Sequence, residues 1–198
     1  AWRQRARDTE LVGFNELSHD SFTRNLSAKL CARVPVICGD EATGLTASTV
    51  AVEADAAACV VVVSEQILSS VHGSVRPVMI EAGCSVGSDP SVPSLAPIDA
   101  VQKLFTQTQV SRSQLHHAEI MEAFAVQAMM CIDGCGIDPD IVNQGGGALA
   151  RGHPIGASGA ILAVRLWHEM QTGDSGALGL AAIAAAGGLG TATLLRAG

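Results

Sequence analysis

The sequence predicts an α/β fold in which one mixed β-sheet is covered by helices. Apolar runs of strand length alternate along the chain with amphipathic segments of helix length, as in layered α/β domains. Apolar residues make up 48% of the 198 residues and aromatic residues only 3%, so the core consists mainly of Val, Ala, Leu and Ile. This much apolar surface excludes bulk disorder.

Each element is predicted from a local pattern. The run 56–64 (AAACVVVVS) is β-branched and does not alternate, which is typical of a strand buried on both faces. Gly83 is expected to end the next strand, Pro97 to lie in the first turn of a helix, and Ser158 to cap another. The predicted elements are, in chain order, helices over 7–16 and 26–30, a strand over 56–64, a helical turn over 66–70, a strand over 76–82, a helix over 98–107, a strand over 117–120, helices over 123–131 and 158–171, and strands over 178–185 and 191–195.

Charge, cysteine content and hydropathy exclude several classes of partner. The net charge of −7 argues against nucleic acid or an anionic membrane, since both need clustered basic residues. The uncharged stretch 175–195 contains glycines and predicts two strands joined by a turn rather than a membrane span. No CxxC pair occurs, so we expect no metal site. We expect the thiols to be reduced and the protein to be cytoplasmic. We expect no signal peptide, because the early arginines are followed by acids.

The segment 143–159 (NQGGGALARGHPIGASG) has the features of a catalytic site. Its glycines let the backbone approach a ligand or another chain closely. Pro154 restricts the backbone at His153, and the helix that follows points its free N–H groups toward the same space. A histidine placed in this way can activate a nucleophile or hold an oxyanion, although a turn histidine bonded to the backbone is the alternative.

Four blocks of the chain resemble the thiolase family in order and spacing. The segment 143–160 resembles the thiolase signature N-x-x-G-G-A-x-A-x-G-H-P-x-G-x-S-G. The other blocks are 46–65 (TASTVAVEADAAACVVVVSE), 122–125 (EAFA) and 179–192, which ends in GGLGTA. The resemblance implies the second half of a thiolase, with residues 1–45 a remnant of the loop domain and residues 46–198 the C-terminal βαβαβαββ domain. This domain would form part of an αβαβα layered core.

The resemblance also implies a site and a missing partner. His153 is the catalytic residue that it assigns here. The nucleophilic cysteine belongs to the family's N-terminal half, and neither Cys31 nor Cys38 matches it. That half would come from the same precursor or from a separate subunit, in a homo- or hetero-oligomer. The substrate would be an acyl thioester of coenzyme A, a substrate of lipid metabolism, with no bound cofactor. The substrate-binding positions implied are Ala51, Phe124, Gly152, Gly187 and Gly188.

Two positions depart from the family pattern in a way that affects chemistry. Ala184 stands where the family has its acid/base cysteine, and a methyl group exchanges no proton. Met121 replaces the asparagine of the NEAFA block, and a thioether donates no hydrogen bond. A general acid–base group typically contributes about 10²–10⁴-fold, and an oxyanion donor roughly 10²–10³-fold. We therefore expect impaired Claisen chemistry.

Three hypotheses remain at this level. In the first, the chain completes a thiolase-like acyltransferase in which His153 activates a partner-supplied cysteine. In the second, it is a catalytically inactive thiolase-fold scaffold or regulatory subunit. In the third, which is compatible with the first, it is a piece of a longer protein, because the apolar strands 56–64 and 178–185 would otherwise lack a covering layer.

Overall fold

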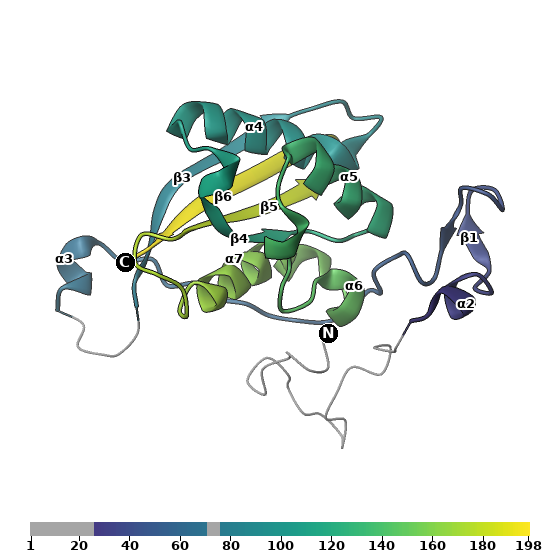
Figure 1. The fold of residues 1–198 in the computed structure, drawn as a ribbon, viewed down its shortest axis with the longest axis horizontal. Helices are drawn as coiled ribbons and strands as arrows, with labels where there is room; N and C mark the ends of the chain where they lie inside the picture. The colour runs from purple at the N-terminus through teal and green to yellow at the C-terminus, as the bar shows by residue number, and fades with distance from the viewer. Residues whose placement is uncertain (1–25, 71–75) are drawn as a thin grey trace, which may run out of the picture.

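The computed structural model of the chain describes residues 26–70 and 76–198 (Figure 1). The helix predicted over 7–16 lies outside these residues. The described α-helices are α2 (Ala28–Cys31), α3 (Glu65–Leu68), α4 (Ala96–Thr108), α5 (Ala125–Cys135), α6 (Ala148–Arg151) and α7 (Ser158–Glu169). The strands are β1 (Val36–Cys38), β2 (Leu45–Thr46), β3 (Val78–Gly87), β4 (Leu115–Ile120), β5 (Leu178–Ala185) and β6 (Leu189–Ala197). Short 3₁₀ turns are η1 (Pro93–Leu95), η2 (Arg112–Gln114), η3 (Pro139–Ile141) and η4 (Ile155–Ala157).

The main sheet has four strands in the order β3-β6-β5-β4. Strands β4 and β5 are parallel, whereas β6 is antiparallel to both β5 and β3. A single parallel bridge joins Ala118 of β4 to Val142, next to the glycine-rich segment. The predicted mixed α/β sheet is therefore confirmed. A separate antiparallel pair, β1 and β2, forms a second small sheet.

Helices cover both faces of the main sheet, with α4 and α5 on one side and α7 on the other (Figure 1). The alternation of strand side chains separates the two halves of the core. Leu194 of β6 packs in the cluster that includes Leu104 of α4, whereas the next residue, Leu195, packs with Leu166 of α7. The sheet is therefore the middle of three layers, with α4 and α5 on one face and α7 on the other.

Most predicted elements are present, with shifted ends. Helix α4 has Pro97 in its first turn as expected, and β5 has the predicted bounds. Gly83 does not end its strand, because β3 continues to Gly87 while paired with β6. Ser158 is not an N-cap: η4 precedes α7, and the residue at the cap position is Ala157, whose side chain makes no capping bond.

The prediction of a buried strand over 56–64 was wrong for the described chain. The segment crosses the molecule between β2 and α3 outside the four-stranded sheet (Figure 1), and none of its residues is assigned to a strand. Val61 is 82% exposed and Val62 71% exposed. A β-branched run carries the propensity for a strand, but a strand also needs a neighbour to supply its hydrogen bonds, and the described residues supply none.

Candidate active site

His153 lies in the connection between α6 and α7. Helix α6 ends at Arg151, and Gly152 adopts a φ of 94° that side chains rarely tolerate. The Gly152 N–H donates to the Ala148 carbonyl at 2.8 Å, which closes the last turn of α6. The chain then reverses through His153, Pro154 and η4 into α7. The glycine-rich sequence thus places one imidazole at the start of a long helix.

Two hydrogen bonds fix the backbone and the ring of His153. Its N–H donates to the Val52 carbonyl at 2.7 Å, and its ring Nδ1 lies 2.7 Å from the Ser158 Oγ. The ring therefore bonds to a side chain, not to the backbone as in the alternative interpretation. Burial lowers the pKa of His153 below its ordinary value of 6.5, and the positive charge of Arg151 lowers it further. Neutral imidazole is thus the favoured form near neutral pH, with Nε2 as the nitrogen that can face a reactant.

An extended segment, residues 49–53, joins His153 to the start of α5. The Ala51 N–H donates to the Ala123 carbonyl at 3.0 Å, and the Ala125 N–H donates to the Thr49 carbonyl at 2.8 Å. Isolated bridges pair Val50 with Phe124 and Glu53 with His153. Three of the predicted site residues, Ala51, Phe124 and His153, therefore lie on this segment or in backbone contact with it.

The side chains packed against Ala51 of this segment are apolar. Met121, Ala148 and Leu162 form a small buried cluster, and Ala51 and Ile183 pack against it. The Met121 N–H donates to the Ala182 carbonyl at 3.0 Å, which ties the end of β4 to β5. The implied substrate-binding position Ala51 and the departure Met121 therefore lie together. Their side chains offer a reactant no strong hydrogen-bond donor.

The remaining predicted positions lie on the β5–β6 hairpin. Ala184 is half-buried and pairs with Gly190 of β6. Gly187 and Gly188 form the turn, each with a φ of 83°. The Gly188 carbonyl accepts from the Ser88 N–H at 2.6 Å, and a Cβ at this position would overlap the Ser88 carbonyl. Among the described residues no hydrogen bond joins this turn to His153, and its glycines are explained by the turn and by this close approach.

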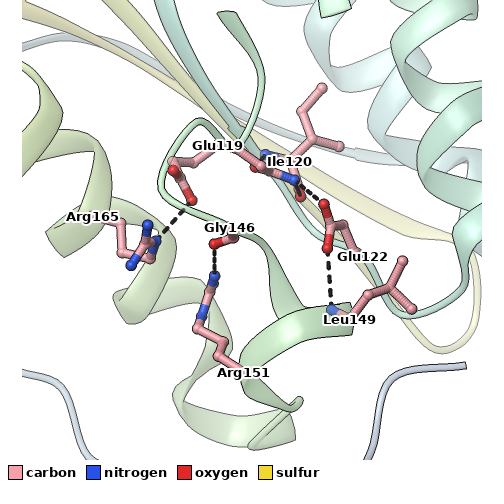
Figure 2. A network of polar contacts seen from close by, with 8 residues as sticks. Glu119, Ile120, Glu122, Gly146, Leu149, Arg151 and Arg165 are labelled. Carbon is pink, nitrogen blue, oxygen red and sulfur yellow. Dashed lines mark hydrogen bonds and ion pairs between the residues drawn. The ribbon is translucent and has the colours of Figure 1, made fainter. Parts of the chain in front are cut away.

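A polar network between the end of β4 and α6 was not predicted from the sequence (Figure 2). Asn143 bonds in both directions with Ile120: its Oδ1 accepts from the Ile120 N–H and its Nδ2 donates to the Ile120 carbonyl, each at 2.9 Å. The same Nδ2 donates to Glu122 at 2.6 Å, and the other carboxylate oxygen of Glu122 accepts from the Leu149 N–H at 3.1 Å. Strand β4 and helix α6 are thereby held together just ahead of His153.

A buried ion pair completes this network. Arg165 Nε of α7 lies 3.4 Å from Oε2 of Glu119, and the two side chains are 5% and 1% exposed. Arg151 Nη1 donates to the Gly146 carbonyl at 2.8 Å. Burial raises the pKa of Glu119 to about 7, against the opposing effect of Arg165 and Arg151. Glu119 lies in the predicted strand 117–120, but only its place in the fold reveals that it is buried and that Arg165 is its partner.

Other candidate groups have structural roles. His116 is exposed, and its Nδ1 accepts from the Leu178 N–H at 3.3 Å at the β4–β5 pairing. Trp167 is half-buried and meets His168 edge-on, with ring centroids 4.9 Å apart. Within residues 26–70 and 76–198, no three His, Cys, Asp or Glu side chains gather as a metal site would require. No helix in the same ranges has the length and hydropathy needed to cross a bilayer.

Comparison with known proteins identifies the family. A sequence model of the "Thiolase, C-terminal domain" matches residues 76–197. YhfS of Bacillus subtilis (strain 168), described as a candidate acetyl-CoA C-acetyltransferase, is 35% identical over 191 residues, covering 94% of this chain and 52% of YhfS. The acetyl-CoA acetyltransferase of Cupriavidus necator is 37% identical over 153 residues, which cover 77% of this chain and 38% of that enzyme.

A solved structure agrees in fold. The crystal structure of the Acat5 thiolase from Ascaris suum in complex with coenzyme A superposes with a TM-score of 0.74 at 31% identity, over 88% of this chain and 44% of that one. The chain belongs to the thiolase family. It spans about half the length, or less, of these relatives.

Proposed function

We propose that this chain supplies the histidine half of a thiolase-type acyltransferase, and that an N-terminal half supplies the nucleophilic cysteine. The observation that carries the proposal is the placement of His153: its Nδ1 is held by Ser158 and its backbone by Val52. Because burial favours the neutral ring, Nε2 can accept a proton from a thiol near neutral pH.

The proposed reaction is acyl transfer from a thioester to that cysteine. The cysteine gives its proton to Nε2 of His153, and the thiolate attacks the thioester carbonyl. A new carbon–sulfur bond forms, the bond to the carrier sulfur breaks, and the departing thiolate takes the proton from His153. An acceptor then removes the acyl group from the enzyme. Coenzyme A as the carrier is supported by the names of the acetyl-CoA acetyltransferases and by the coenzyme A complex of the Ascaris thiolase.

The exposed valines support the N-terminal half as the partner. Four consecutive valines, 60–63, are exposed, each to 43% or more. A run of this kind has the composition of a strand that lacks a neighbour, and a further sheet or helix layer would cover it. The relatives are about twice as long as the matched region, which leaves room for that layer in the same polypeptide or in a second subunit. Oligomerisation is part of the same proposal.

Impaired Claisen chemistry is also proposed. Carbon–carbon bond formation needs a second base at the position of Ala184 and a donor at the position of Met121. Ala184 has no titratable group, and Met121 lies in the apolar cluster with Ala148 and Leu162. Acyl transfer to another acceptor, or slow hydrolysis, needs only the cysteine and His153. A cytoplasmic location fits the six cysteines, all of which are free thiols.

The test is trapping of the acyl-enzyme. The protein that contains both halves is mixed with acetyl-CoA, and its intact mass is followed over time. We expect a gain of one acetyl group, strongly reduced in His153→Ala and unchanged in His116→Ala, since His116 serves the β4–β5 pairing. An adduct that forms equally in His153→Ala, or no adduct in the unmodified protein, contradicts the proposal.

An inactive scaffold is the second candidate, favoured by the apolar surroundings of Ala51 and Met121. It is distinguished by restoring the family residues in the double variant Ala184→Cys/Met121→Asn. A drifted enzyme is expected to gain acetoacetyl-CoA cleavage in this variant, measured by loss of the substrate's enolate absorbance. A scaffold is expected to show neither this gain nor the acetyl adduct.

A further inference from the structure

The buried ion pair between Glu119 and Arg165 links the sheet to the helix that holds His153. Glu119 belongs to β4 and Arg165 to α7, and both side chains are at least nine-tenths buried. Such a pair contributes little stability, because removing two charges from water costs about as much as their attraction returns. Breaking it by removing one partner, in contrast, is costly. The geometry around the pair therefore suggests a role besides stability.

Arg165 and Ser158 lie on the same side of α7. They are separated by about two helical turns, so both project in nearly the same direction. Both are buried, Ser158 to 2% exposure and Arg165 to 4%. The ion pair therefore fixes the rotation of α7 about its axis at one end, while Ser158 meets the imidazole of His153 at the other.

The same guanidinium supports the loop that leads to His153. A Cβ at Gly145 would overlap the Nη2 of Arg165, so the loop backbone packs directly on this group. In the next turn, Arg151 donates to the Gly146 carbonyl. Figure 2 shows Glu119, Arg165, Gly146 and Arg151 in one region, below the end of β4. Displacement of Arg165 would thus disturb both the helix side and the loop side of His153.

We infer that Glu119 and Arg165 are positioning residues for His153, which set α7 so that Ser158 holds the imidazole with Nε2 free to act. The inference rests on the proposed function only for the chemical role of His153. The charged groups near the pair are Arg151 of α6, Glu122 after β4 and Glu169 of α7. Near the imidazole they are Arg151, and Glu53 through the backbone bridge.

The experiment measures the pKa of His153. Exchange of the imidazole C2 hydrogen with deuterium, followed by mass spectrometry as a function of pH, gives the pKa of each histidine in the protein that contains both halves. Arg165→Met and Ser158→Ala should each raise the pKa of His153 toward 6.5, because a ring that is no longer held moves into solvent and away from Arg151. Glu119→Gln, which keeps the shape of the side chain, should produce a smaller rise and serves if Arg165→Met does not fold.

The control separates positioning from loss of stability. Val101→Ala removes buried volume from α4, on the opposite face of the sheet from α7, and lowers Tm without touching the ion pair. We expect it to leave the pKa of His153 unchanged. An unchanged pKa in both Arg165→Met and Glu119→Gln, or an equal rise in Val101→Ala, overturns the inference. This readout needs no acyl transfer, so it can succeed or fail independently of the acyl-enzyme test.

Discussion

Ser158 occupies the first turn of α7, yet its hydroxyl bonds to His153 and not to a helix N–H. A cap was the natural expectation, since serine is a preferred residue just before a helix. A short 3₁₀ turn moves the helix start by one residue and frees the hydroxyl. Local propensity located the site but could not predict this bond, which depends on where the preceding loop places the imidazole.

The first residue-scale prediction concerns the pH dependence of acylation. The pKa of His153 is lowered in the folded protein, so the neutral ring persists below pH 6.5. The acid limb of the acylation rate should therefore have its midpoint below pH 6.5. In Ser158→Ala we expect this midpoint to rise and the maximal rate to fall about tenfold, the equivalent of one hydrogen bond of about 1.4 kcal/mol. Single-turnover acylation across pH 5–8 measures both, and a midpoint above 6.5 in the unmodified protein would contradict the assignment.

The second residue-scale prediction concerns Gly147. A Cβ there would overlap the carboxylate of Glu122, which also binds Asn143 and the Leu149 N–H. Gly147→Ala should therefore lower the free energy of unfolding by about 1–3 kcal/mol. Gly159→Ala is the matched control, because a Cβ there meets nothing within 4 Å. Urea denaturation compares the two, and equal effects would show that the Glu122 contact is not what excludes a side chain.

The order of strands and helices along the chain follows from hydrophobic periodicity, whereas the residues that pair across the fold do not. Helix α4 and strand β5 lie where the pattern places them, because each buries an apolar face against the sheet. Glu119, in contrast, is a buried charged residue of β4, and its partner Arg165 lies far away in the sequence. A sequence pattern predicts which side chains are buried. It does not predict which charged groups form a pair, since that depends on how α7 crosses the sheet.

The element-scale prediction is a pH dependence of stability that arises from β4. The pKa of Glu119 is 4.5 in the unfolded chain and about 7 when folded, so the folded state binds the extra proton between these values. Its contribution to stability is fully present below pH 4.5 and is lost as pH rises through about 7. The difference in unfolding free energy between the unmodified protein and Glu119→Gln should fall by on the order of 3 kcal/mol across this range. Denaturant titrations at several pH values measure it, and a difference independent of pH would rule out the raised pKa.

The exposure of segment 56–64 has a physical reason that explains why its prediction as a buried strand was wrong. Its composition is that of a buried strand, but burial requires a covering layer that the described residues do not contain. Under the proposed function, the N-terminal half accounts for two things. It is the layer that would cover residues 56–64, and it is the part of the relatives' length that this chain does not span. The sequence pattern therefore describes the complete assembly better than it describes this half alone.

The last prediction concerns the cover that an N-terminal half would provide for residues 59–63. In the protein that contains both halves, the backbone amides of residues 59–63 should exchange slowly with deuterium, because a neighbouring strand or layer protects them. In the chain alone they should exchange rapidly, since Val61 and Val62 are largely exposed.

Val61→Lys/Val62→Lys should abolish the protection and the acyl adduct together, because charged side chains oppose burial of the segment. Gln102→Lys/Gln107→Lys on the exposed side of α4 adds the same charge as a control and should change neither. Rapid exchange of 59–63 in the complete protein would show that the valines remain uncovered and that the N-terminal half does not bind there.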